Sequence, residues 1–182
     1  IFNSKKSKYM CIKPKEMKHL PVPSVILKGD RLDIVTQYKY LGMKICDNMM
    51  DDESVTAQIR SMYSRGNILI KHFKYCSDNV KALLFKTYCS SFYCSHLWSK
   101  CSTTSLNRLK VAHNRIFRVL LRLEHRISMS FTFLQFNIHH SAVILRNSMN
   151  GFISRLWKSE NNIIQTLVNS DYYCNSSLYH YW

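Results

Sequence analysis

The sequence has few residues that interrupt helices and strands, with only 4 Gly and 3 Pro among its 182 residues. This scarcity argues against long flexible linkers and low-complexity tracts. Apolar residues make up 46% of the chain and aromatic residues 13%. That is enough apolar material to bury the core of one ordinary domain or of two small ones.

The sequence also lacks an uninterrupted apolar run long enough to span a membrane. Its most apolar stretch, residues 82–98, is broken by Lys86 and His96, so a buried helix is the better interpretation. The first residues are polar and basic and do not resemble a secretory signal. We therefore expect no membrane partner and a nuclear or cytoplasmic location. The start at Ile1 rather than Met suggests a piece of a longer chain.

Acidic residues are scarce where the chain is most basic. The sequence holds 26 Lys and Arg against 11 Asp and Glu, a formal charge of +15. Between residues 54 and 158 there are sixteen Lys or Arg and two acids, Asp78 and Glu124, whereas six acids lie between Asp30 and Glu53. Such one-sided charge on an apolar-rich region favours a polyanionic partner, nucleic acid above all. A merely soluble basic surface, or one that docks on acidic proteins, remains the alternative.

Cysteine is present in an odd number, seven, without the spacing of a metal site. Cys89, Cys94, His96 and Cys101 cluster in sequence, but no second Cys-x-x-Cys pair completes a tetrahedral set. In a chain without a secretory signal, reduced thiols are the simpler interpretation. We expect buried core thiols and no metal or cofactor held by this chain.

The first third of the chain has the pattern of short strands. Val25 and Leu27 alternate with other residues, a turn is expected at Gly29-Asp30, and the alternation resumes at Leu32, which together predict an antiparallel hairpin. A third strand is expected over residues 38–45. Gly42 interrupts it, which is typical of a bulge or of a close backbone approach.

The rest of the chain has helical periodicity. Apolar residues at steps of three and four predict four helices, over residues 52–75, from Ser77 or Asp78 to near Trp98, from Ser105 past Leu120, and over residues 141–157. Val80, Leu84, Tyr88 and Phe92 would form the core face of the second. Residues 128–140 and 161–182 show no convincing period. The prediction is an α+β fold, a β region over residues 1–50, a helical bundle over 51–158, and a segment of unknown structure over 159–182.

Arginines form a row in the third predicted helix. Arg108, Arg115, Arg118 and Arg122 follow steps of seven, three and four residues, so they would lie on one side of a helix, opposite its apolar face. An unpaired row of this kind repels itself unless it meets counter-charge, and the guanidinium group suits phosphate oxygens. The row predicts phosphate contacts, with a solvated surface as the alternative.

Several segments together resemble the end of the palm and the thumb of reverse transcriptases from non-LTR (LINE-like) retrotransposons. Each is weak alone, but their order and separation match over most of the chain. They are residues 2–8 (Phe-Asn-Ser-Lys-Lys-Ser-Lys), 38–42 (Tyr-Lys-Tyr-Leu-Gly), 58–60 (Gln-Ile-Arg), 65–67 (Arg-Gly-Asn), 84–94 (Leu-Phe-Lys-Thr-Tyr-Cys-Ser-Ser-Phe-Tyr-Cys) and 97–98 (Leu-Trp).

The resemblance implies a role in holding a primer-template duplex. Residues of the second segment, together with Lys44, would form the primer grip, a hairpin that holds the 3′ end of the primer. Its backbone and its basic edge at Lys39 and Lys44 would press against sugar and phosphate without reading sequence. These residues are Tyr38, Lys39, Tyr40, Leu41, Gly42 and Lys44. The partners implied are an RNA template, a DNA primer and the polymerase chain upstream.

The resemblance places the catalytic aspartates, with their magnesium ions, upstream of Ile1. Residues 49–52 (Met-Met-Asp-Asp) look superficially like the metal-binding box of polymerases. Asp51 and Asp52, however, precede a helical pattern rather than sitting between two apolar strands, so we interpret them as acids at a helix start. No catalytic residue is expected in this chain. The alternative function is a non-catalytic, basic, helical module that binds nucleic acid.

Overall fold

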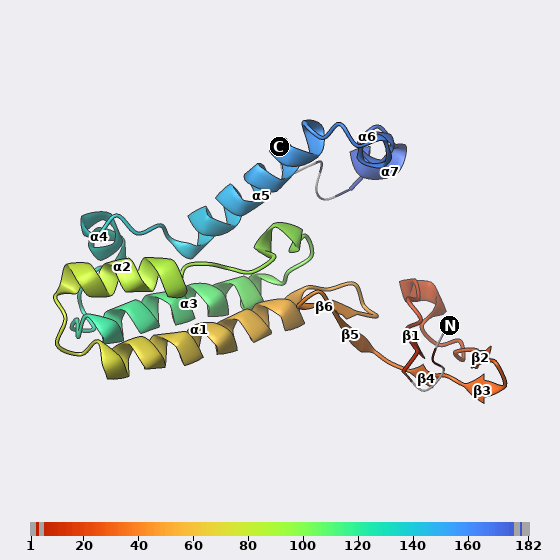
Figure 1. The fold of residues 1–182 in the computed structure, drawn as a ribbon, viewed down its shortest axis with the longest axis horizontal. Coiled ribbons are helices and arrows are strands. Elements are labelled where there is room, and N and C mark those ends of the chain that lie inside the picture. The colour runs from red at the N-terminus through yellow and green to blue at the C-terminus, as the bar shows by residue number, and fades with distance from the viewer. Residues whose placement is uncertain (1–2, 4–5, 177–178, 180–182) are drawn as a thin grey trace. The chain divides into compact units, whose positions relative to one another are not determined.

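The computed structural model describes Asn3, residues 6–176 and Tyr179. Phe2, Ser4 and Lys5 of the first resemblance segment lie outside the described residues. The chain folds into two compact units, residues 1–54 and residues 55–182 (Figure 1). The first unit contains the strands and the second most of the helical residues, so the predicted α+β class with antiparallel strand pairs and a mainly helical remainder is confirmed.

The first unit is built from pairs of very short strands. β2 (Ile26–Leu27) pairs antiparallel with β3 (Asp30–Arg31), and β5 (Gln37–Tyr40) pairs antiparallel with β6 (Met43–Cys46). β1 (Lys8–Tyr9) pairs with β4 (Asp33–Ile34) in parallel, a pairing that the sequence did not predict. A single 3-10 turn, η1 (Lys15–Met17), follows Pro14.

Two hairpin turns correct the sequence interpretation. Lys28 and Gly29 have φ of 54° and 87°, so the first turn lies one residue earlier than Gly29-Asp30. Leu41 and Gly42 have φ of 47° and 85° and join β5 to β6. Two-residue turns with positive φ at both positions match the twist of the strands that they connect. Residues 38–45 are therefore a hairpin, and Gly42 is a turn residue rather than a bulge within one strand.

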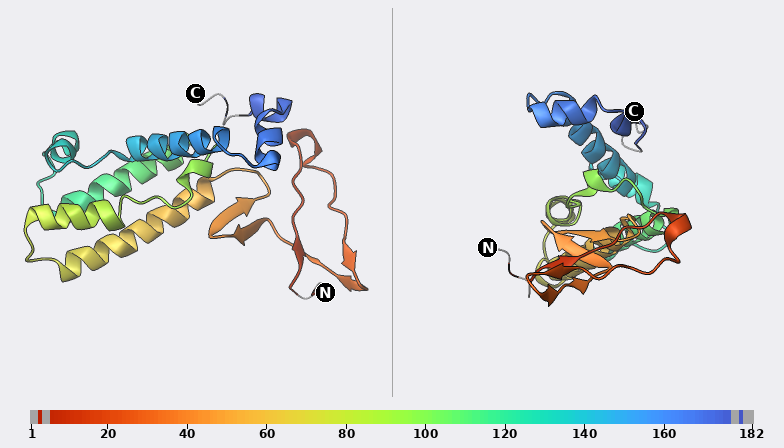
Figure 2. Two further views of the ribbon diagram at one scale, coloured as in Figure 1. Left: turned by 45° about the horizontal axis from the view of Figure 1, so that its top comes forward. Right: turned by 90° about the vertical axis from the view of Figure 1, so that its right-hand side faces the viewer.

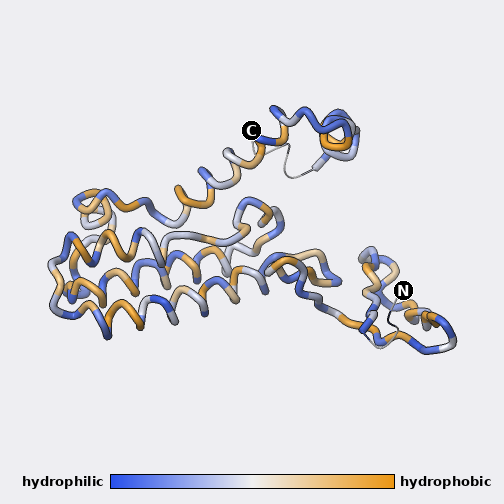
Figure 3. Tube along the Cα trace, in the orientation of Figure 1, coloured by the Kyte–Doolittle hydropathy of each residue, from blue (hydrophilic) through white to orange (hydrophobic). Residues whose placement is uncertain are grey.

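Three helices form the bundle of the second unit. α1 (Asp52–His72) and α3 (Thr103–Leu120) run in the same direction, and α2 (Asp78–Tyr88) runs the opposite way (Figure 1). Apolar and polar residues alternate around each helix (Figure 3). The core side chains with essentially no exposure come from all three helices, and they include Val55, Met62, Phe85, Leu109 and Phe117.

Aromatic rings fill the end of this core. Phe85 from α2 and Phe117 from α3 have ring centroids 4.7 Å apart, and Phe133 from α4 (Met129–Gln135) stacks on Phe117 at 5.3 Å. His113 is buried among them, 4.9 Å from the Phe85 ring and 5.3 Å from the Phe133 ring. The segment before residue 141, for which the sequence showed no period, thus contributes a short helix to the core.

The buried face of α2 differs from the prediction. Val80 and Tyr88 are exposed, whereas Ala82, Phe85 and Cys89 are buried. The helix also ends at Tyr88 rather than near Trp98, because an irregular segment and the 3-10 turn η2 (Ser95–Leu97) follow it. All seven cysteines are free thiols; of the clustered cysteines predicted to be buried, Cys89 is buried, whereas Cys94 and Cys101 are half-buried. Burial raises the pKa of Cys89 to about 11, so this thiol stays protonated.

The ends of α3 also correct the prediction. Its N-cap is Ser102, whose side chain accepts a hydrogen bond from the Ser105 N–H, so the helix begins earlier than Ser105. After Leu120, Arg122 adopts φ of 54° and the Leu123 N–H donates to the Arg118 carbonyl at 3.0 Å. This is the hydrogen-bonding pattern that closes a helix C-terminus. Arg122 therefore lies outside the helix.

The remaining helices follow the bundle. α5 (Ser141–Trp157) has the predicted bounds and packs against η2 and α3. α6 (Asn162–Val168) and α7 (Asp171–Cys174) follow at the C-terminal end of α5 (Figure 2). They lie in the segment for which the sequence predicted no structure. Among the helices of the described residues, none combines the length and the apolar character needed to cross a membrane.

Candidate nucleic-acid interface

The β5–β6 hairpin presents two faces with different chemistry. Cross-strand partners share a face, so Lys39 and Lys44, which are directly paired, lie together on one side. Tyr38 and Tyr40 lie on the other, and both rings are exposed. Leu41, at the turn, is 75% exposed. The hairpin thus offers a lysine pair, two aromatic rings and an apolar tip.

The two lysines of the hairpin differ in their surroundings. The Lys44 ammonium lies 3.4 Å from a Glu53 carboxylate oxygen. The Ser54 hydroxyl contacts the backbone N and O of Lys44 at 3.3 and 3.2 Å, which ties β6 to the first turn of α1. Lys39 is exposed and has no side-chain partner among the described residues. Of the pair, Lys39 is the cation available to a phosphate.

Several acidic residues lie at the base of the hairpin, where α1 begins. α1 begins at Asp52 with Glu53 in its first turn, as expected for acids that complement a helix N-terminus. Burial raises the pKa of the Cys46 thiol, and the nearby carboxylates of Glu53 and Asp47 raise it further. Across the described part of the chain, no three or more His, Cys, Asp or Glu side chains come together as a metal-binding group.

The four arginines predicted as one row differ in exposure and in position. Arg108 and Arg115 are exposed on α3, and within the described residues neither side chain makes a hydrogen bond or ion pair. Arg118 is half-buried, and its Nη2 donates to the Ile127 carbonyl at 3.0 Å. Arg122 is exposed beyond the helix end. The row is therefore not a continuous stripe, because Arg118 faces the protein.

A groove lies between α1 and α3 beside these arginines. Ile59 and Tyr63 line it from α1, and Arg108 lines it from α3. The other lining residues, all from α3, are Thr104, Asn107, Val111 and Ala112. The two helices are in close contact further along, where Gly66 meets Ile116. Arg115 follows Arg108 by seven residues, or about two turns, so the two arginines lie on the same side of α3 about 10 Å apart along its axis.

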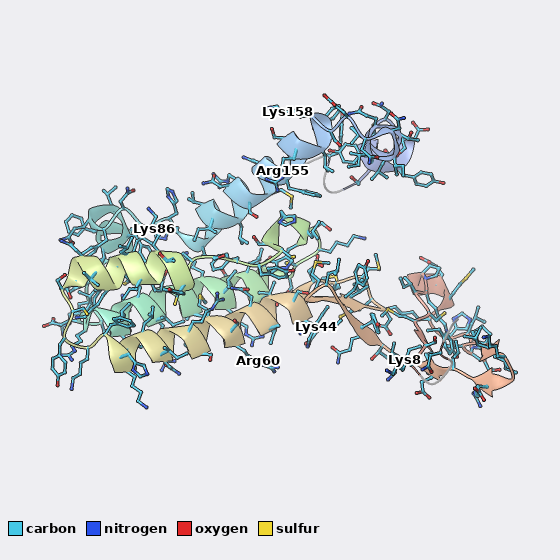
Figure 4. The ribbon with its side chains drawn as sticks, viewed as in Figure 1. Lys8, Lys44, Arg60, Lys86, Arg155 and Lys158 are labelled. Atoms are coloured by element: carbon cyan, nitrogen blue, oxygen red, sulfur yellow. The ribbon has the colours of Figure 1, made fainter. Side chains whose placement is uncertain are left out.

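α1 adds cations that the sequence did not associate with this surface. Arg60, Asn67 and Lys71 are exposed and recur at steps of seven and four residues, so they form one strip of the helix, next to Tyr63. Figure 4 shows Arg60 projecting from α1, and Lys86 projecting from α2 on the opposite side of the bundle. We define the α1–α3 basic face by its cations, Arg60, Lys71, Arg108 and Arg115.

The helical period alone could have revealed the strip of exposed cations on α1, but not that α3 is the helix that packs beside α1. Arg60 and Lys71 lie off the apolar stripe of their own helix, as predicted. That the neighbouring Tyr63 lines the groove with α3 follows only from the packing of the two helices.

No protein-family model, curated protein or solved structure matches the chain.

Proposed function

We propose that this chain binds a nucleic-acid duplex through phosphate contacts that do not read sequence, as the primer-grip and thumb segment of a non-LTR retrotransposon reverse transcriptase. The observation that carries the binding proposal is the pair Arg108 and Arg115. Both are exposed on α3, Arg108 lines the α1–α3 groove, and neither has a counter-charge among the described residues.

Phosphate is the counter-charge that this arrangement suits. A guanidinium group can bind two phosphate oxygens at once. A spacing of about 10 Å along α3 corresponds to roughly three steps of a duplex at about 3.4 Å each, so the two arginines would contact different phosphates. Arg60 and Lys71 from α1 widen the positive surface. Binding would release condensed counterions and would weaken as salt rises.

The hairpin of the first unit offers nucleic-acid contacts of its own. Lys39 supplies a free cation, and the exposed rings of Tyr38 and Tyr40 can pack against sugars or an end base pair. In the polymerase that the resemblance implies, this hairpin would hold the primer end. Magnesium ions on aspartates upstream of Ile1 would then supply the phosphoryl-transfer chemistry.

A non-catalytic module that binds nucleic acid is the second candidate, because the same exposed arginines serve it equally well. The two functions differ in what precedes Ile1. We expect the reading frame to continue upstream and to encode a Tyr-x-Asp-Asp segment between two apolar stretches. A start codon shortly before Ile1 would contradict the polymerase assignment and would favour the free-standing module.

Duplex binding itself is tested by fluorescence anisotropy with a labelled RNA–DNA hybrid. We expect binding that is similar for unrelated duplex sequences and that is lost in high salt. A preference for one sequence that persists in high salt would contradict a phosphate-based mode.

A further inference from the structure

A cavity of about 480 Å³ lies at the C-terminal end of α5. Among the described residues it is lined by Ser154, Trp157, Lys158, Tyr173 and Tyr179. Three of these five side chains are aromatic, one is a cation and none is a carboxylate. Glu160, two residues beyond Lys158, is exposed and does not line the cavity. The volume is in the usual range for small-molecule sites, roughly 300–1,000 Å³.

The rings around the cavity meet nearly at right angles. The Trp157 and Tyr173 ring centroids are 6.1 Å apart with planes at 73°, and those of Tyr173 and Tyr179 are 5.8 Å apart with planes at 83°. In such a corner a flat ring can stack on one face and meet the edge of the next. Trp157 is about half exposed and Tyr173 is 5% exposed, so one ring is open to a ligand and the other is held in place.

The position of Tyr173 is set by the local hydrogen bonds of α7. The Ser170 hydroxyl accepts from the Tyr173 N–H at 3.3 Å and so caps the helix. The Ser176 hydroxyl donates to the Tyr173 carbonyl at 2.6 Å. Tyr173 is therefore anchored through its backbone on both sides, and the residue lines the cavity.

The Tyr173 hydroxyl is buried and has no hydrogen-bond partner among the described residues. A buried donor without a partner is unfavourable, and an acceptor from a ligand would relieve it. Lys158 lines the same cavity, and Figure 4 shows Arg155 on the same end of α5. The site thus combines aromatic faces with nearby positive charge, and one of its lining tyrosines carries a buried hydroxyl without a partner among the described residues.

We propose that this cavity holds one unpaired nucleotide of a single-stranded nucleic acid, its base stacked in the aromatic corner and its phosphate near Lys158. Every base has a flat face and ring or carbonyl acceptors for the Tyr173 hydroxyl, and the adjoining phosphate matches the lysine. The cavity is distinct from the α1–α3 basic face, so this site goes beyond the duplex binding proposed above and does not depend on it.

The test measures the affinity of the chain for a labelled short oligouridylate by anisotropy at low salt. Replacement of Trp157 by Ala should weaken single-strand binding roughly tenfold, as expected for the loss of one stacked base. Tyr173→Phe removes only the hydroxyl and leaves the ring in place, and it should weaken binding about two- to tenfold. Tyr172→Ala is the matched control, because Tyr172 is the neighbouring residue on α7 and is 89% exposed outside the cavity.

Two further measurements separate the possible occupants. Uridine monophosphate should bind much more weakly than the oligouridylate, and equal affinity would overturn the assignment to a strand. The apolar dye ANS serves as a second probe. Dye binding that Trp157→Ala abolishes, with oligouridylate binding unchanged, would assign the cavity to an apolar ligand and overturn the proposal.

Folding and duplex binding provide the controls for these variants. Circular dichroism must show the helical signal of the wild type, and Tyr173→Phe keeps the test decisive if Trp157→Ala does not fold. Binding of an RNA–DNA hybrid should remain unchanged in both variants. Unchanged oligouridylate affinity in folded Tyr173→Phe and Trp157→Ala would overturn the proposal while leaving the duplex-binding function untouched.

Discussion

Gly66 on α1 lies against Ile116 on α3 so closely that a β-carbon added at Gly66 would stand 2.5 Å from Cγ2 of Ile116. This contact is the point where the two helices that carry the α1–α3 basic face meet. The absence of a side chain at Gly66 therefore allows the approach of the two helices that brings their cations to one surface.

Replacement of Gly66 by Ala should destabilise the fold. Overpacking against a branched side chain costs about 1–3 kcal/mol, offset in part by the roughly 1 kcal/mol that Ala gains over Gly in a helix. We expect a net loss of up to about 2 kcal/mol in the free energy of unfolding by urea. Removing the clash with Ile116→Ala in the same chain should make the double variant more stable than the sum of the two single effects predicts.

Gly151→Ala is the matched control for this change. Gly151 lies within α5, and an added β-carbon would be 3.6 Å from Arg155 Nη1, an ordinary contact. We expect this variant to be neutral or up to about 1 kcal/mol more stable. Equal destabilisation at both glycines would show that close approach to α3 is not what sets the cost at Gly66.

Arg118 should matter for stability more than for binding. Its Nη2 holds the Ile127 carbonyl in the loop between α3 and α4, and its Nε is buried. Arg118→Gln should lower the free energy of unfolding by about 1–3 kcal/mol, as for loss of a charged hydrogen bond. Arg115→Gln on the exposed face of the same helix should change it by less than about 0.5 kcal/mol. Equal stability of the two variants would place Arg118 on the solvent side.

His113 should make the fold sensitive to acid. Burial lowers its pKa to about 4, with a smaller contribution in the same direction from His140. The unfolded chain, with an ordinary histidine pKa near 6.5, then binds more protons than the folded chain below that pH. Stability is full above about pH 6.5 and falls as pH drops toward 4. From about pH 7 to about pH 5 the loss from this residue is on the order of 2 kcal/mol.

His113→Phe tests this assignment. The variant should lose less stability between about pH 7 and about pH 5 than the wild type does, because the group that takes up the proton is gone. His96 retains a pKa lowered by burial and by Arg155, so some acid sensitivity will remain. A pH dependence identical to that of the wild type in urea titrations would contradict the account of His113.

The sequence predicted the bounds of α5 correctly. Apolar residues recur there at helical spacing, and polar residues fill most of the other positions. In α2 both sides carry apolar residues, and only the packing of Phe85 against Phe117 decides which side is buried. Gly42 was misread because a glycine within an apolar run looks the same in a bulge and in a two-residue turn.

The site was predicted less completely than the fold. The spacing of residues placed Arg108 and Arg115 on one side of α3, and it wrongly added Arg118 to the same exposed row. The hydrogen bond from Arg118 to the Ile127 carbonyl could not be foreseen, because Ile127 lies in a loop with no periodic signal. The aromatic cavity was missed entirely. Tyr173 and Tyr179 lie in a segment without a period, and their proximity to Trp157 arises from tertiary packing.

The isolated chain should not extend a primer. Asp51 and Asp52 stand at the start of α1 and, with the other described acids, belong to no group suited to a metal ion. On a poly-rA template with magnesium or manganese, nucleotide incorporation should equal that of a vector-only control. Incorporation above that control which disappears on replacement of Asp51 and Asp52 by Ala would reverse the interpretation of these residues.

The most direct test of the central claim is the salt dependence of binding to an RNA–DNA hybrid. If Arg108 and Arg115 contact phosphates, their joint replacement by Gln should make the slope of log affinity against log salt shallower by about one to two units, because each phosphate contact contributes a little under one. Lys86→Gln, on the opposite side of the bundle, should leave the slope nearly unchanged. An unchanged slope in a folded Arg108→Gln/Arg115→Gln variant would contradict the α1–α3 basic face as the nucleic-acid interface.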